Sequence, residues 1–173
     1  MKDRIAAEVL RLKKKYPGFS PEELASALGI HVLKKAMGAF PGACKGFFIC
    51  LNRIPYITVN SELSHELQQI IICHELGHAV LHRDYPEMMA LHDVALFDDT
   101  SRFEYEANLF AAEYLLSDSD VLETMMAGMP LSSAAASLGV PMELLDFKWR
   151  AMEKRGIAPA APMLARGDFL RKF

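Results

Sequence analysis

Apolar side chains between residues 63 and 82 recur at steps of three and four, the spacing that places them on one face of an α-helix. This pattern predicts a buried helix over residues 64–82. A second stripe of the same kind predicts another buried helix over residues 102–116. The first stripe consists of Leu63, Leu67, Ile70, His74, His78 and Leu81, and the second of Phe103, Ala107, Phe110, Ala111 and Tyr114.

Shorter patterns on either side predict a small sheet and further helices. Residues 46–51 and 56–60 are expected to form the strands of a hairpin joined through residues 52–55, and residues 30–33 are a candidate third strand. A capping box between Ser20 and Glu23 marks a helix start. Helices are expected over residues 4–15, 20–28, 132–138 and 142–155.

Two histidines on the first predicted helix are spaced for joint binding of a metal ion. His74 and His78 are four positions apart, so they lie one turn above each other, and both rings can reach one Zn²⁺ at about 2.0–2.1 Å. Glu75 flanks such an ion and can take a proton from water, which then becomes a nucleophile. The alternative is a pair of core histidines satisfied by hydrogen bonds. Gly77 argues against that alternative, because a glycine within a helix costs about 1 kcal/mol and indicates close approach of another segment.

A catalytic zinc site usually has a third protein ligand. The extended pattern that supplies a third histidine is not present, because Leu81 and Asp84 occupy its glycine and histidine positions. Asp84 stays open as a ligand. Glu104 is the better candidate, because a carboxylate on a helix that packs into the core needs a partner. Asn108 follows Glu104 by four positions, where its amide can orient a metal-bound group.

The other acidic and histidine side chains near these motifs are expected at the surface. This applies to Glu106 and Glu113 on the second predicted helix. It also applies to His82 and His92, which flank a long acidic connection over residues 83–100. A connection of that length is often functional, and it could form a wall over the site.

Composition limits the classes of protein to consider. The chain has 173 residues, 51% of them hydrophobic, so one domain with a substantial core is expected. The net charge of −3 gives no strong attraction for nucleic acid or anionic lipid.

The sequence also indicates where the protein resides. The chain has no apolar run long enough for a membrane span, and its start lacks the apolar core of a secretion signal. We therefore expect a cytoplasmic protein without a membrane partner. Cys44, Cys50 and Cys73 have no metal-ligand spacing and are expected to be reduced, buried thiols.

The helical pair over residues 132–155 has the outline of a helix-turn-helix, so DNA binding through Arg150 and Lys154 is one alternative. The charge of the second helix is nearly balanced and its large apolar residues require burial. We therefore expect an αα-hairpin packed on the core, over about residues 130–155, with no direct contact to nucleic acid.

Several motifs taken together resemble the ImmA/IrrE family of zinc metallopeptidases. They are the segments 23–30 (ELASALGI), 57–60 (ITVN), 73–78 (CHELGH), 104–112 (EYEANLFAA) and 136–140 (ASLGV), and the resemblance covers most of residues 20–155. The chain departs from the family pattern at Ser117 and Asp118, where Met-Pro is frequent. The resemblance implies that Glu104 is the third ligand of a Zn²⁺ ion, beside His74 and His78, and it agrees with the choice made from the residues.

The same resemblance, read with the patterns above, implies an α+β fold. We expect a minimal zincin-like core over about residues 20–117, in which a small mixed three-stranded sheet packs against a metal-binding helix pair, with additional N- and C-terminal helices. The single domain would cover residues 1–156, followed by a loosely ordered tail over residues 157–173.

The function implied is that of a zinc-dependent endopeptidase with Glu75 as catalytic base. Its substrate would be a DNA-binding repressor of the helix-turn-helix type, from a phage or mobile element, whose cleavage relieves repression. A strand at the cleft edge, made of Tyr56, Ile57, Thr58 and Val59, would pair with the extended substrate. Two further alternatives stay open: a zinc-stabilised module that binds a transcription factor without cutting it, and a zinc hydrolase acting on a small amide.

Overall fold

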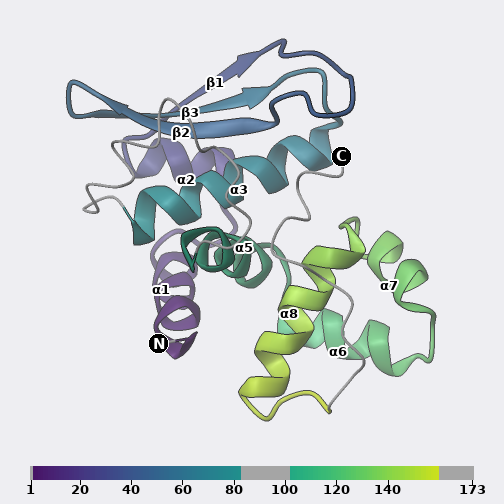
Figure 1. The fold of residues 1–173 in the computed structure, drawn as a ribbon. Coiled ribbons are helices and arrows are strands. Elements are labelled where there is room, and N and C mark those ends of the chain that lie inside the picture. The colour runs from purple at the N-terminus through teal and green to yellow at the C-terminus, as the bar shows by residue number, and fades with distance from the viewer. Residues whose placement is uncertain (1, 83–101, 160–173) are drawn as a thin grey trace.

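The computed structural model describes residues 2–82 and 102–159 (Figure 1). Its strands are β1 (His31–Lys35), β2 (Gly46–Leu51) and β3 (Ile54–Asn60). Its helices are α1 (Lys2–Lys15), α2 (Pro21–Ala27), α3 (His65–Leu81), α5 (Arg102–Leu115), α6 (Asp118–Met126), α7 (Leu131–Ser137) and α8 (Met142–Lys154). The predicted connection over residues 83–100, with Asp84 and His92, lies outside the described ranges, as does most of the predicted tail.

The strands form one mixed sheet in the order β1-β3-β2. β3 runs parallel to β1 and antiparallel to β2, with Ile57 paired to Val32 on one side and to Phe48 on the other. β2 and β3 are joined at Asn52 and Arg53, whose φ angles of 50° and 69° are those of a tight two-residue hairpin turn. The predicted hairpin and the mixed three-stranded sheet are confirmed.

The position of β3 contradicts one expectation from the sequence. Tyr56, Ile57, Thr58 and Val59 were expected at an edge where a substrate strand pairs. They lie instead in the central strand, where hydrogen-bond partners on both sides already use the backbone. An extended peptide needs a free row of N–H and C=O groups, and only an edge strand offers one. The edge strand antiparallel to β3 is β2.

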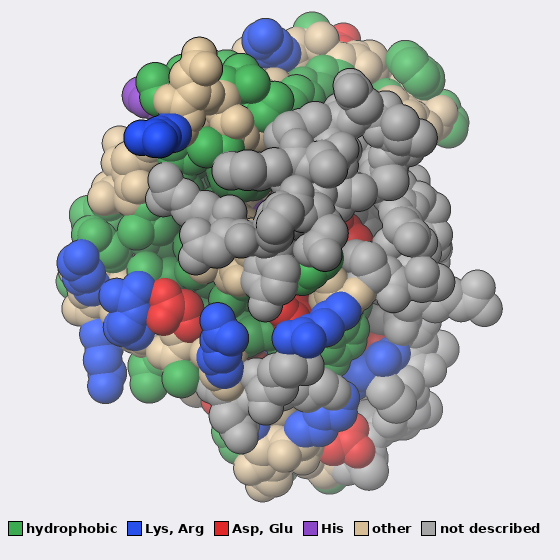
Figure 2. All heavy atoms as spheres, turned by 60° about the vertical axis from the view of Figure 1, so that its left-hand side comes forward, with side chains coloured by type: hydrophobic (Ala, Val, Ile, Leu, Met, Phe, Trp, Pro, Cys, Tyr) green, Lys and Arg blue, Asp and Glu red, His purple; other side chains and the backbone are tan. Residues whose placement is uncertain are grey.

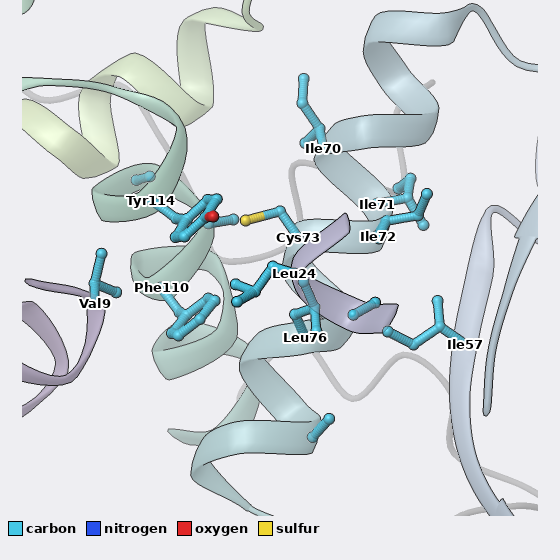
Figure 3. Packing of buried hydrophobic residues seen from close by; sticks show 14 of the residues in the cluster. Val9, Leu24, Ile57, Ile70, Ile71, Ile72, Cys73, Leu76, Phe110 and Tyr114 are labelled. Carbon is cyan, nitrogen blue, oxygen red and sulfur yellow. The ribbon is translucent and has the colours of Figure 1, made fainter. Parts of the chain in front are cut away.

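One face of the sheet is covered by helices, and the main core lies between them. Figure 1 shows α2 and α3 along this face, with α5 on the other side of α3. Ile57 and Val59 of β3 project into this core and are fully buried. Figure 3 shows Leu76 of α3 facing Phe110 of α5, and the Cys73 thiol directed at Tyr114. This arrangement confirms the predicted α+β fold, with the sheet packed against the pair formed by α3 and α5.

The C-terminal helices pack around a second group of buried apolar residues. Val121 of α6, Ala134 of α7, and Leu145, Trp149 and Met152 of α8 contribute to it. Helix α6 was not predicted, since Val121 is its one buried residue and such a helix has little apolar periodicity to detect. Ser117, where the chain departs from the family pattern, caps α6 by accepting a hydrogen bond from the Asp120 amide at 3.1 Å.

Helix α8 is buried over most of its length, which favours the packed hairpin over the DNA-binding alternative. Arg150 pairs with Asp146 of the same helix at 2.6 Å. Lys148 is 2% exposed and contacts Glu113 of α5 at 2.7 Å and Asp118 at 2.6 Å. The expectation that Glu113 faces solvent was wrong, because α8 covers that side of α5. On the face shown in Figure 2, basic side chains in the lower half of the view stand beside acidic ones.

None of the helices within residues 2–82 and 102–159 is both long and apolar enough to cross a lipid bilayer.

Candidate metal centre

Helix α3 carries the two predicted metal ligands in its C-terminal half. Its start is capped by Ser64, whose hydroxyl accepts a hydrogen bond from the Leu67 amide at 3.3 Å. The sheet lies on one side of this helix and α5 on the other, so every residue from 70 to 79 is buried. His74 and His78 therefore stand on consecutive turns in the interior, 5% and 4% exposed.

Gly77 sets how closely α5 approaches these histidines. A Cβ added at this position would lie 2.9 Å from the Ala107 Cα and 3.2 Å from the Phe110 Cβ. Real side chains do not tolerate such contacts with backbone, so the glycine is what permits this crossing. The close approach inferred from the sequence is therefore present, and Ala107 lies one turn beyond Glu104 on α5.

The approach of α5 brings the Glu104 carboxylate between the two imidazoles. Its Oε2 lies 3.2 Å from the His74 Nε2, and its Oε1 lies 3.2 Å from the His78 Nε2. The two Nε2 atoms are 3.2 Å apart. One ligand atom from each of the three residues falls within 4.8 Å of the others, so the group could hold a metal ion. Two imidazole nitrogens and a carboxylate oxygen match the ligand set of many catalytic zinc sites.

The electrostatics of the three residues favour a charged carboxylate among the histidines. Burial by itself would raise the pKa of Glu104, but hydrogen bonds from His74 and His78 hold that pKa far below its usual value. Burial opposes protonation of His74, yet the Glu104 carboxylate raises the pKa of this imidazole. The Glu104 carboxylate and the His74 imidazole therefore favour each other's charged forms, and the same carboxylate would stabilise a metal cation held there in place of the protons.

Glu75 lies beside the ligands in a site that water scarcely reaches. Its residue is 8% exposed, and burial raises the pKa of its carboxyl while His74 and His78 act in the opposite direction. A hydrogen-bond contribution from the Phe48 backbone amide also lowers this pKa, so the carboxyl faces strand β2. A buried carboxylate with a raised pKa is suited to accepting and returning a proton.

Asn108, the predicted orienting residue, is 1% exposed on α5. Its side chain contributes to raising the pKa of His74, so it lies beside that imidazole. No hydrogen bond to the Nδ1 of His74 is formed within the described part of the chain.

Two residues expected at the surface lie behind the proposed ligand His78 instead: His82 contacts it, and Glu106 contacts His82. His82 is 1% exposed, and its Nδ1 lies 3.2 Å from the Nδ1 of His78. Its Nε2 lies 3.0 Å from the Glu106 carboxylate, whose side chain is 13% exposed. Burial lowers the pKa of His82. The signal for His82 was available in the sequence, since it follows His78 by four positions and continues the row that starts at His74.

Comparison with known proteins places this arrangement in a family. The family model of the IrrE N-terminal-like domain, peptidase family M78, matches residues 25–150. The chain belongs to the ImmA/IrrE family of metallopeptidases. The matched region contains all three potential metal ligands and Glu75.

Two relatives of this family member are informative. An uncharacterized immunity region protein 2 of Bacillus phage phi105 is 37% identical over 146 residues, which span 83% of this chain and 88% of the phage protein. The metallopeptidase ImmA of Bacillus subtilis (strain 168) is 33% identical over 94 residues, or 53% of each chain. The similarity therefore extends over most of a phage protein and over half of a metallopeptidase.

Proposed function

We propose that this protein is a zinc-dependent endopeptidase in which His74, His78 and Glu104 hold the ion and Glu75 is the catalytic base. The observation that carries the proposal is the convergence of the three ligand atoms within 4.8 Å of one another. Membership in a metallopeptidase family supports the same chemistry. A bound Zn²⁺ would supply a Lewis acid that polarises the scissile carbonyl.

Glu75 performs the proton transfers in this proposal. Its carboxylate accepts a proton from the water that attacks the peptide carbonyl, and it then donates that proton to the nitrogen of the departing amine. Burial suits both steps, because it makes the carboxylate a stronger base than one in water. Asn108, buried beside His74, keeps that imidazole in position.

The free edge of β2 is the proposed docking strand for the substrate, in place of β3. β2 pairs with β3 on one side, and within the sheet it has no neighbour on the other. The influence of the Phe48 amide on Glu75 indicates that this edge faces the catalytic carboxyl. An extended peptide added to the edge would place its backbone next to Glu75, with affinity from main-chain hydrogen bonds.

The proposed substrate is a helix-turn-helix repressor whose cleavage relieves repression. The support is the relationship to a protein named for a phage immunity region and to a metallopeptidase, ImmA. The test incubates the full chain, loaded with Zn²⁺, with each helix-turn-helix protein encoded next to its gene. We expect fragments with the wild type and with Glu66→Gln, a change at an exposed position of the same helix.

Glu75→Gln should keep its zinc and produce no fragments. Cleavage by Glu75→Gln at the wild-type rate would remove Glu75 from the mechanism. Binding of the repressor without fragments by the wild type would favour the alternative, a zinc-stabilised module that controls a transcription factor without proteolysis.

A further inference from the structure

His82 connects the proposed metal ligand His78 to a second carboxylate. Its ring touches His78 through the two Nδ1 atoms, 3.2 Å apart, and Glu106 through its Nε2, 3.0 Å from the carboxylate Oε2. The other oxygen of Glu106 accepts a hydrogen bond from the Arg102 Nε at 2.6 Å. The chain Arg102–Glu106–His82–His78 thus runs from the helix surface, where Arg102 is exposed, into the metal centre.

The direction of each hydrogen bond in this chain follows from what its atoms can donate. The Glu106 carboxylate is ionised beside Arg102 and can only accept, so the His82 Nε2 is the donor. In a neutral ring the other nitrogen then has no proton. The His82 Nδ1 is therefore an acceptor, and its contact with His78 requires that His78 carries its proton on Nδ1.

We propose that His82 and Glu106 are positioning residues that hold His78 in the tautomer with a bare Nε2. That nitrogen is the one that faces the Nε2 of His74 and the Oε1 of Glu104, so a bare Nε2 could coordinate an ion held among these three residues. Without this acceptor, His78 is free to carry its proton on Nε2, where it blocks coordination. The arrangement extends the usual pairing of a metal-bound histidine with a carboxylate by one additional imidazole.

A purely structural role for His82 makes different predictions. The ring is buried and packs edge-on against Phe103, with centroids 4.7 Å apart, so it also fills space at the end of α3. A substitution that preserves the ring but removes the acceptor separates the two roles. His82→Phe does this, because phenylalanine keeps the contact with Phe103 and offers no nitrogen to His78.

The first measurement needs no variant. Long-range ¹H–¹⁵N spectra of the Zn²⁺-loaded full chain report which ring nitrogen of each histidine carries the proton, and the His78 signal is assigned by its loss in His78→Gln. We expect a hydrogen-bonded proton on the His78 Nδ1 in the wild type, and faster exchange of this proton with solvent in His82→Phe. A wild-type His78 without a proton on Nδ1 overturns the proposal.

The second measurement is the affinity for Zn²⁺ alone, by competition with a chelator. His82→Phe should bind Zn²⁺ about 10–100-fold more weakly than the wild type, the usual effect of losing a residue that orients a ligand. His82→Asn should recover most of that loss, because its amide oxygen can take the place of Nδ1 as an acceptor. Glu106→Gln should show a smaller loss than His82→Phe, since an amide both donates and accepts and leaves the tautomer of His82 undefined.

Leu81→Ala is the matched control, because Leu81 lies on the same last turn and packs against the main core but has no polar side-chain atom to offer His78. It should lower the melting temperature and leave both the tautomer of His78 and the zinc affinity unchanged. Wild-type zinc affinity in His82→Phe, or an equal loss in Leu81→Ala, contradicts the proposal. If His82→Phe does not fold, the zinc affinity of Glu106→Gln and the wild-type spectrum decide between the positioning role and the structural role of His82.

The inference rests on the proposed metal centre but not on proteolysis. If the protein binds Zn²⁺ through His78 but cleaves no substrate, the proposed endopeptidase activity is wrong and the proposed role of His82 is unaffected. If the wild type cleaves its substrate and His82→Phe keeps the wild-type zinc affinity, His82 has no positioning role and the endopeptidase proposal is unaffected.

Discussion

Gly77 of α3 and Ala107 of α5 meet at a crossing so close that an added Cβ on Gly77 would lie 2.9 Å from the Ala107 Cα. The contact is with backbone, so no side-chain rotation can relieve it. Helix α5 also carries Glu104, whose carboxylate lies 3.2 Å from both His74 and His78. The separation of the two helices at Gly77 is therefore part of the geometry of the proposed metal centre.

Gly77→Ala is expected to force α3 and α5 apart. The overpacking should cost about 1–3 kcal/mol, more than the gain of about 1 kcal/mol from replacing a glycine within a helix. Because Glu104 moves with α5, zinc affinity should fall together with the melting temperature. Chelator competition and thermal unfolding of the same sample provide the check, and a more stable protein with full zinc affinity would disprove the argument.

Glu104→Gln is expected to remove the charged ligand while keeping its shape. Loss of a direct ligand should weaken zinc binding more than the roughly 10–100-fold seen for residues that only orient ligands. Elemental analysis after dialysis against a weak chelator should find wild-type protein with zinc and Glu104→Gln without it. Glu123→Gln, at an exposed position of α6, is the control and should retain its metal. Equal zinc content in all three proteins would exclude Glu104 as a ligand.

Lys148→Met is expected to destabilise the packing of α8 on α5. It leaves the buried Glu113 carboxylate with Arg155, 3.2 Å away, as its remaining ion-pair partner among the described residues. Removing one member of a buried ion pair costs about 3–5 kcal/mol, and Arg155 should keep the loss near the lower end. Chemical denaturation of the wild type and the variant measures this loss in the free energy of unfolding.

The double variant Lys148→Met, Glu113→Leu supplies the matched comparison, because it removes both charges together. It should be less destabilised than the sum of the two single variants, as expected for residues in direct contact. Additive losses would show that the pair is not coupled.

We expect the free energy of unfolding to fall at high pH because of Tyr114. Its hydroxyl donates to the Phe19 carbonyl at 2.9 Å, and burial raises the pKa of the phenol to about 12. The unfolded chain releases this proton near the ordinary pKa of about 10, so above that pH the folded state binds more protons than the unfolded state. The contribution to stability is complete below about pH 10 and is lost as the pH rises towards 12.

The check on Tyr114 is the free energy of unfolding as a function of pH for the wild type and Tyr114→Phe. The difference between the two proteins should narrow as the pH rises from about 10 to 12. A constant difference across that range would mean that Tyr114 titrates normally in the folded protein.

Local sequence predicted those parts of the site that depend on one helix. His74, Glu75 and His78 are fixed relative to one another by the geometry of a single helix, so their spacing alone indicated metal chemistry. Burial of Glu104 beside them was inferred from the apolar stripe of its own helix, and Gly77 marked the helix crossing. In each case the information lies within a few residues of the chain.

Strand order and the burial of polar side chains could not be obtained in the same way. Whether β3 lies at an edge or in the centre depends on which distant strand pairs with each of its sides, and an alternating pattern is the same in both positions. Glu113 looked like a surface residue until α8 supplied Lys148, 35 positions later in the chain.

The sequence by itself therefore predicted the class of fold and the side chains that we propose as ligands and base, because helical periodicity and a local motif encode them. Only the tertiary structure decided that β3 is the central strand with β2 at an edge of the sheet, and that His82 lies between His78 and Glu106. These outcomes depend on contacts between segments far apart in the chain, where the free energy of a polar side chain is set by what packs over it rather than by its neighbours in sequence.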